Sequence, residues 1–213
     1  MRDFILHREE RMRLSSLNTE QFPALSTSIH WGIIEAKFRL NDLVDENLVS
    51  NISIIPFVGD QCVVFQLENG DWELPGGTLE AGEPYMDGLK RELMEELGAE
   101  MRSYQIFGQF HCTSSALEPY RPHIPHPHFV RIIGYGDVEL VGDPLNPEDG
   151  EQVVAVEMVE IDEAIRRFEE QNRHDIAEMY KLAHMLREET KQCEARTRYS
   201  NSKIAYGGND DSR

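Results

Sequence analysis

The sequence has little of what marks secreted, membrane or zinc-binding proteins. It has three cysteines among 213 residues, Cys62, Cys112 and Cys193, and their odd number and wide spacing give neither a disulfide framework nor a zinc motif. No apolar run approaches the ~20 residues that span a bilayer. The start, MRDFILHREER, has too short an apolar stretch for a secretory signal. We therefore expect a protein of the reducing cytoplasm without a membrane partner.

Basic residues are also scarce. The chain has 21 Lys and Arg against 39 Asp and Glu, which gives a formal net charge of −18. This balance argues against a nucleic-acid polymer as the main partner, because such binding depends on cationic contacts to phosphates. It does not exclude a nucleotide, because a bound metal ion supplies local positive charge. We expect a small-molecule substrate.

The stretch 77–99, GTLEAGEPYMDGLKRELMEELGA, predicts a helix with one buried face. Pro84 suits the first turn, because its φ is already helical and its missing N–H has no helical partner. Gly98 suits the position after the helix end, where a left-handed conformation costs glycine nothing. The apolar stripe that faces the core consists of Met86, Leu89, Leu93 and Leu97.

Three glutamates, Glu92, Glu95 and Glu96, fall together on a flank of this stripe. Carboxylates at this spacing repel one another, and repel more strongly when desolvated. A hard divalent cation would hold them together, and Mg²⁺ or Mn²⁺ fits because each binds oxygen ligands and substrate phosphates. A solvated acidic face is the alternative, which the flanking Gly77 and Glu83 make less favoured.

The spacing of the polar and glycine residues in this stretch carries a family resemblance. Gly77 is followed by Glu83, then by Arg91-Glu92, Glu95-Glu96 and Gly98. At every fixed position this resembles the signature of the Nudix hydrolases, including the MutT-like enzymes. Members of that family cut a diphosphate linkage in compounds built as a nucleoside diphosphate joined to another group.

The resemblance implies roles for the residues of the stretch. The three glutamates Glu92, Glu95 and Glu96 would be metal ligands, and Arg91 would orient one of them. The carbonyl at the Gly77 position often completes the metal shell in the family. Glu83 would reach the metal directly or through water.

The hydrolytic water needs a base within hydrogen-bond reach. The candidates in the stretch are Glu83, Glu95 and Glu96, with the metal lowering the pKa of the water. Other family members take the base from an acidic loop after this stretch, and the matching residues here are Glu148, Asp149 and Glu151. A solvated acidic turn is the alternative for those three.

Two glycine positions allow structural expectations. Gly88 lies inside the predicted helix, where glycine costs roughly 1 kcal/mol relative to alanine. A small residue there would let a strand or a ligand backbone approach the metal side, or it is simply tolerated. The segment Leu74-Pro75-Gly76-Gly77 resembles a strand that ends in a turn which a Cβ would obstruct.

Outside this stretch, histidines and aromatic residues are candidates for substrate contacts. Three imidazoles in PHIPHPH, at positions 123, 126 and 128, could bind Zn²⁺, although the prolines between them keep the segment extended. A loop over the substrate is favoured over a zinc site, with His126 or Arg121 contacting phosphate, and a plain structural loop is a comparable alternative. Trp72 and Tyr120 could stack on a base, as could Phe107 and Phe110, but aromatic residues near strands more often belong to the core.

Hydrophobic patterning predicts an α/β sandwich with a mixed sheet, which agrees with the Nudix-type α/β/α fold. The expected strands are 51–58, 61–67, 72–74, 103–112, 129–140 and 152–161, and the later helices are 162–171 and 175–188. Residues 1–50 would be a leader, with a helix at 2–13 and a strand at 36–40, that packs on the main domain or on a second subunit of a homodimer. Residues 51–190 would form the Nudix domain, and residues 191–213 a polar tail that we expect to be disordered.

The exact substrate is ambiguous from the sequence. ADP-ribose hydrolases of the family often carry a proline where this chain has Ser114 and Ser115, and dinucleoside-polyphosphate hydrolases a tyrosine near where it has Tyr120. These departures favour a nucleoside triphosphate pyrophosphohydrolase of the housecleaning type. The alternatives are an ADP-ribose or other nucleotide-sugar pyrophosphatase, and a nucleotide-sensing module without catalysis.

Overall fold

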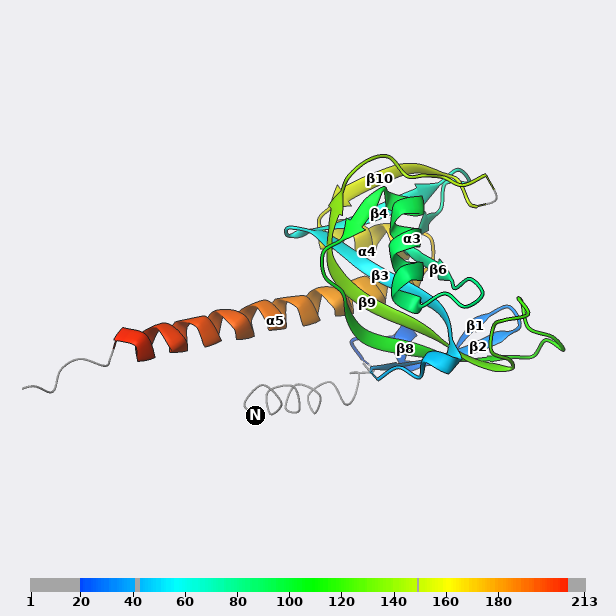
Figure 1. Cartoon of the computed structure of the whole chain (residues 1–213), viewed down its shortest axis with the longest axis horizontal. Helices are drawn as coiled ribbons and strands as arrows, with labels where there is room; N and C mark the ends of the chain where they lie inside the picture. Colours follow the sequence, from blue (N-terminus) through cyan, green and yellow to red (C-terminus); the bar gives the residue numbers. More distant parts are fainter. Residues whose placement is uncertain (1–19, 41–42, 149, 207–213) are drawn as a thin grey trace, which may run out of the picture.

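The computed structural model describes residues 20–40, 43–148 and 150–206. Its centre is a mixed sheet with the strand order β1-β2-β8-β9-β3-β4-β10 (Figure 1). Only the pairing of β3 with β9 is parallel among the described strands. The strands are β1 (Ile29–Trp31), β2 (Ile34–Leu40), β3 (Val49–Val58), β4 (Gln61–Leu67), β5 (Trp72–Glu73), β6 (Gly76–Thr78), β7 (Ala99–Met101), β8 (Gln105–Ser114), β9 (His128–Leu140) and β10 (Val153–Val159). The helices are α2 (Pro23–Ser26), η1 (Glu46–Leu48), α3 (Tyr85–Leu97), α4 (Ile161–Glu170) and α5 (His174–Tyr206).

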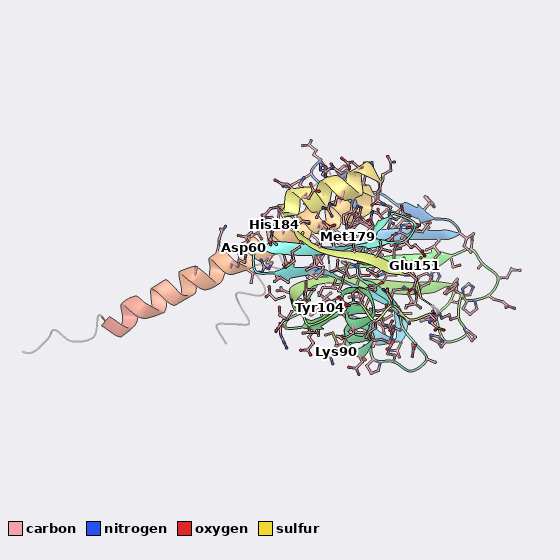
Figure 2. All side chains as sticks on the ribbon, turned by 90° about the horizontal axis from the view of Figure 1, so that it is seen from above. Asp60, Lys90, Tyr104, Glu151, Met179 and His184 are labelled. Carbon is pink, nitrogen blue, oxygen red and sulfur yellow. The ribbon has the colours of Figure 1, made fainter. Side chains whose placement is uncertain are left out.

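Helices cover both faces of the sheet. Successive residues of a strand point to opposite faces, so β3 sends Ile52 and Ile54 to one face and Ile55 and Phe57 to the other. The first pair packs in one cluster with the buried α3 leucines, and the second packs in another with residues of α4 and α5. Figure 2 shows Lys90 on the α3 side of the sheet and Met179 on the α5 side. The predicted α/β/α sandwich with a mixed sheet is confirmed.

The leader belongs to the same sheet. Strand β2 pairs with β8 along its whole length, from Ile34 opposite Ser114 to Leu40 opposite Gly108. The predicted strand at 36–40 is therefore present, and this part of the leader packs on the main domain. Since β3 begins at Val49 and the leader strands extend its sheet, the predicted boundary at residue 51 does not separate two structural units. The helix expected at 2–13 lies outside the described residues.

The segment after residue 190 differs from the prediction. Helix α5 continues to Tyr206, and its second half extends away from the sandwich (Figure 1). Between His174 and Tyr206 the sequence has no proline or glycine, so nothing local breaks the helix. The expectation of a disordered tail was therefore wrong for residues 191–206. None of the helices in the described part of the chain is long and apolar enough to cross a membrane.

Strands β3 and β4 separate soon after the turn that joins them. They pair only through Phe57 with Cys62 and Val58 with Gln61. Farther along, β6 pairs with β3 and β5 pairs with β4. The linking segment is tied to β3, because the N–H of Ile54 donates to the carbonyl of Pro75 at 2.9 Å. This separation places the glycines of β6 beside the C-terminal half of α3.

Candidate active site

Helix α3 has the predicted ends and the predicted buried face. Pro84 immediately precedes Tyr85, the first helical residue, with a φ of −62°. Gly98 ends the helix in the left-handed conformation with a φ of 59°, and its N–H bonds to the carbonyl of Leu93. The leucines of the predicted stripe are buried, with Met86 packed against the same cluster. The helix therefore has a fixed rotation, which directs its glutamates toward β6.

Arg91 connects the carboxylates of α3. Its Nε and Nη2 donate to the two oxygens of Glu83 at 2.9 and 3.0 Å. Its Nη1 donates to Glu92 at 2.9 Å and to Glu95 at 3.2 Å. The hydrogen bonds with Glu83 raise the pKa of Arg91 and lower the pKa of Glu83. Arg91 thus fixes the side-chain directions of Glu92 and Glu95.

Glu83 is held on both carboxylate oxygens. Besides the two bonds from Arg91, its Oε2 accepts the backbone N–H of Glu80 at 2.9 Å. In this geometry Glu83 positions Arg91. Its roles as a metal ligand and as a base stay predictions.

Glu92 lies against the glycine backbone of β6. A Cβ placed on Gly77 would stand 2.0 Å from Oε1 of Glu92, so this approach requires glycine. The Glu92 side chain is 13% exposed, and burial raises its pKa, with Arg91 acting in the opposite direction. Gly77 therefore makes room for the Glu92 carboxylate. A Cβ at this position would be obstructed by that side chain of α3.

Glu96 is the most deeply buried of the three glutamates in their shared flank. Its Oε2 accepts the backbone N–H of Gly76 at 2.9 Å. Burial raises its pKa well above the usual range, and the nearby charges of Glu92, Glu151 and Glu95 act in the same direction. A carboxylate in this environment needs a proton or a cation to be stable.

The structure gives Gly88 a different role from the predicted one. A Cβ on Gly88 would meet Cδ2 of Leu79 at 2.7 Å and Oε2 of Glu83 at 3.0 Å. Glycine at this position therefore makes room for the segment that brings Glu83 to Arg91. The prediction of a strand or ligand backbone in this space was wrong.

The three glutamates of the flank suit a hard divalent cation by chemistry, because they offer only oxygen donors. Their repulsion and the raised pKa values of Glu92 and Glu96 give a physical reason for cation binding. In the described residues no group of three or more His, Cys, Asp or Glu is arranged as a finished metal site. Arg91 contacts two of these glutamates and supplies part of the balancing charge.

The acidic loop after β9 docks on the end of α3. The N–H of Leu145 donates to the carbonyl of Met94 and the N–H of Asn146 to the carbonyl of Glu95. The side chain of Asn146 then exchanges two hydrogen bonds with the backbone of Val153. Glu151 consequently lines the same cavity as Glu96, and its role as a base stays a prediction. Glu148 is exposed, and Asp149 lies outside the described residues.

A cavity of about 440 Å³ adjoins Glu96. This volume lies in the range of small-molecule sites, roughly 300–1,000 Å³. Its wall combines apolar residues of the sheet and α5 with charged side chains. The lining residues include Trp31, Ser53, Glu73, Gly76, Arg131, Arg173 and Asp175.

Of the predicted substrate residues, Phe110 lines this cavity, whereas Trp72, Tyr120, Arg121 and His126 are not among the described residues that line it. The ring of Trp72 lies 4.2 Å from the Arg167 guanidinium of α4. Tyr120 is exposed beside Arg121, whose Cζ is 5.8 Å from its ring, and His126 is half-buried. Substrate contacts by these four residues stay predictions.

The other two histidines of PHIPHPH contact separate partners. The Nε2 of His123 is 2.8 Å from the carbonyl of Leu79, which places this loop beside the segment that follows β6. The Nδ1 of His128 is 3.2 Å from the hydroxyl of Thr113 in β8. Phe107 and Phe110 are buried in the core, in agreement with the alternative considered for the aromatic residues.

The sequence reading missed Trp31, Arg131 and Arg173. One signal was available for Arg131, which interrupts the apolar run Phe129–Tyr135 of a strand. A charged residue at an inward position of such a strand requires an explanation. Trp31 and Arg173 come from distant segments of the sequence, and only the topology of the fold places them in the same cavity wall as Arg131.

Replacing Arg91 with lysine should lower the free energy of unfolding by about 1–3 kcal/mol, the cost of leaving buried polar groups unsatisfied. A lysine ammonium lacks the planar fork that bridges Glu83, Glu92 and Glu95. Urea denaturation measures this loss. The matched control is Lys90→Ala, because Lys90 makes an exposed ion pair with Asp87 and its loss should cost about 0.5 kcal/mol or less. Equal losses in the two variants would contradict a connecting role for Arg91.

Comparison with known proteins identifies the domain. The model of the NUDIX domain matches residues 48–182. A MutT-like protein of Streptomyces ambofaciens is 34% identical over 59 residues, which cover 28% of this chain and 38% of that protein. The chain thus matches well under half the length of this curated relative.

Similar solved structures include two from bacteria. The Bacillus subtilis pyrophosphohydrolase BsRppH has a TM-score of 0.48 at 17% identity and covers 62% of this chain and 77% of its own. A NUDIX hydrolase from Nitrosomonas europaea has a TM-score of 0.47 at 17% identity, with coverages of 65% and 89%. The family model, which matches more than half of the chain, decides the assignment: this protein belongs to the Nudix family.

Proposed function

We propose that the protein is a Mg²⁺- or Mn²⁺-dependent pyrophosphohydrolase. It would cleave a diphosphate linkage in a nucleoside diphosphate joined to another group. The observation that carries the proposal is Glu96, a buried carboxylate fixed by the N–H of Gly76 at the wall of the 440 Å³ cavity. Such a group is suited to bind a cation or to accept a proton beside a bound substrate.

The acidic residues of α3 would form the cation site. Glu92, Glu95 and Glu96 would hold the cation, together with the backbone at Gly77. A bound cation lowers the pKa of water and stabilises charge on phosphoryl oxygens.

A proton from the water would pass to a carboxylate at the cavity. Glu96 and Glu151 line the cavity, which supports either as the base, while Glu95 stays a candidate. Arg91, anchored by Glu83, keeps Glu92 and Glu95 in position.

The proposed substrate is a small nucleotide. The cavity volume and the charge of −18 both favour this over a nucleic-acid polymer. A nucleoside triphosphate is the favoured member of the class, with ADP-ribose or another nucleotide sugar as the alternative. A cytoplasmic location and a homodimer remain predictions.

A substrate panel tests the proposal. Nucleoside triphosphates, oxidised triphosphates, ADP-ribose and dinucleoside polyphosphates are incubated with Mg²⁺ or Mn²⁺, and the products are identified by chromatography. We expect cleavage of a diphosphate linkage that stops when the metal is chelated. Tight nucleotide binding without any product would instead identify a nucleotide-sensing module.

A further inference from the structure

One cation of the cavity wall has a stacked aromatic partner, and in the part of the chain that the structure describes it forms no ion pair. Arg131 of β9 lines the cavity, and its Cζ lies 4.8 Å from the centre of the Trp31 ring in β1. Phe110 packs against the same indole, with ring centroids 5.1 Å apart and an interplanar angle of 62°. The leader strand thus supports the guanidinium from one side.

The other cation of the wall is neutralised. Arg173 donates to Glu73 at 2.8 Å and lies 3.5 Å from Asp175. Within the described residues, by contrast, Arg131 makes no side-chain hydrogen bond or ion pair. Burial lowers the pKa of Arg131, yet a guanidinium keeps its charge in proteins. Asp175 and Glu73 lie close enough to favour its charge, but neither forms an ion pair with it, so the N–H groups of Arg131 stay available to an anionic ligand.

Arg131 and Glu96 enter the wall of the same cavity from different elements of the fold. In the sheet, β3 lies between β9 and β6, with Asn51 opposite both Arg131 and Thr78. Two strand spacings of about 4.8 Å separate β9 from β6 by roughly 10 Å. Glu96 is bound to Gly76 of β6. A substrate whose diphosphate lies at Glu96 can therefore place another of its groups at Arg131, which lines the same cavity.

The part of the Arg131 guanidinium that Trp31 leaves uncovered indicates which chemical group of a ligand it can bind. One face of the guanidinium is covered by the indole, whereas its N–H groups point outward in the plane. This fork matches the oxygens of a phosphate or a carboxylate. Stacking of a base on the side of Trp31 that faces Arg131 is disfavoured, because the guanidinium already occupies it.

We propose that Arg131, supported by Trp31, is a specificity residue that binds an oxyanion on the part of the substrate distant from the scissile diphosphate. The inference rests on the proposed function and narrows its substrate class. The preferred compounds carry a phosphate or carboxylate in addition to the diphosphate that is cleaved.

A binding experiment tests the oxyanion site without catalysis. In a Trp72→Phe protein, Trp31 is the remaining tryptophan, and its fluorescence is titrated with inorganic phosphate or acetate in the presence of chelator. We expect a saturable change that Arg131→Gln removes and Arg131→Lys weakens. Arg102→Gln is the matched control, since Arg102 pairs with Glu139 and Glu100 on the surface. The response to phosphate or to acetate identifies the anion, and an unchanged titration in folded Arg131→Gln overturns the proposal.

A kinetic experiment tests specificity with compounds that differ by one phosphate. Coenzyme A is compared with dephospho-coenzyme A, and NADPH with NADH. For any pair that is hydrolysed, Arg131→Gln should lower kcat/KM at least tenfold for the phosphorylated member, mainly through KM, and leave the other member within twofold. Equal losses for both members would show a purely structural role and overturn the proposal. If no diphosphate compound is hydrolysed, the proposed function fails, while the titration still decides whether Arg131 binds an oxyanion.

Discussion

Replacing Glu96 with glutamine should reduce turnover of the best substrate by at least ~10²-fold, the usual effect of losing a catalytic acid–base group. The amide can still accept the N–H of Gly76, so the local packing is retained. It carries no charge, and it can neither bind a divalent cation strongly nor accept a proton from water. Steady-state kinetics in Mg²⁺ measures the loss. Near wild-type turnover would contradict the proposed role of Glu96.

The same substitution should not destabilise the metal-free protein. Burial raises the pKa of folded Glu96 above its unfolded value, so its contribution to stability is fully present below an unfolded pKa of about 4.3 and is lost as pH rises through the folded pKa. In chelator at pH 7.5, the Gln variant should therefore resist urea at least as well as wild type, with a difference that shrinks toward pH 4. Glu100→Gln, an exposed change just after α3, is the control for both activity and stability. Inactivity accompanied by unfolding would leave Glu96 with a structural role only.

Much of the sheet and all of the principal helices could be predicted from local patterns. Alternating or continuous apolar runs located β3, β4, β8, β9 and β10 to within a few residues. Apart from the C-terminal part of α5, the segments that were missed are short, such as β1 and β7, which have three residues each. Such strands exist because a neighbour provides hydrogen bonds, as β2 does for β1. Their own sequence carries little signal.

The candidate site, like the fold, could be predicted where its residues are close in sequence and was missed where they are far apart. The glutamates of α3 lie within one helix, so spacing alone placed them on one flank, while the family resemblance placed the backbone at Gly77 beside the metal. The cavity wall brings together Trp31, Arg131 and Arg173, which are separated by many tens of residues. Their proximity depends on the order of strands and on the packing of α5, which no local pattern encodes. Gly88 was misjudged because the side chain of Glu83 folds back over the helix.

Alanine at Gly76 and at Gly77 should have different consequences, although the residues are neighbours. Gly76 has a φ of +131°, and a Cβ there would lie 2.2 Å from the carbonyl oxygen of Ile52 and 2.5 Å from Cα of Ser53. Both obstacles are backbone atoms of the central strand β3. Relief requires β6 to separate from β3, so we expect Gly76→Ala to abolish folding into a soluble, cooperatively unfolding protein.

The three atoms nearest to a Cβ at Gly77 all belong to the Glu92 carboxylate, the end of a flexible side chain, with the closest at 2.0 Å. The carboxylate can move aside, so Gly77→Ala should fold. It would then lose the position of one proposed metal ligand, which predicts a fall in activity of about 10- to 100-fold, the range found when a group that orients a ligand is removed. Circular dichroism and thermal denaturation separate the two variants, and a titration of activity with Mg²⁺ should show a higher metal requirement for Gly77→Ala. If that variant keeps full activity and metal affinity, the position of Glu92 against β6 does not matter for catalysis, and the cation must be held by Glu95 and Glu96 without it.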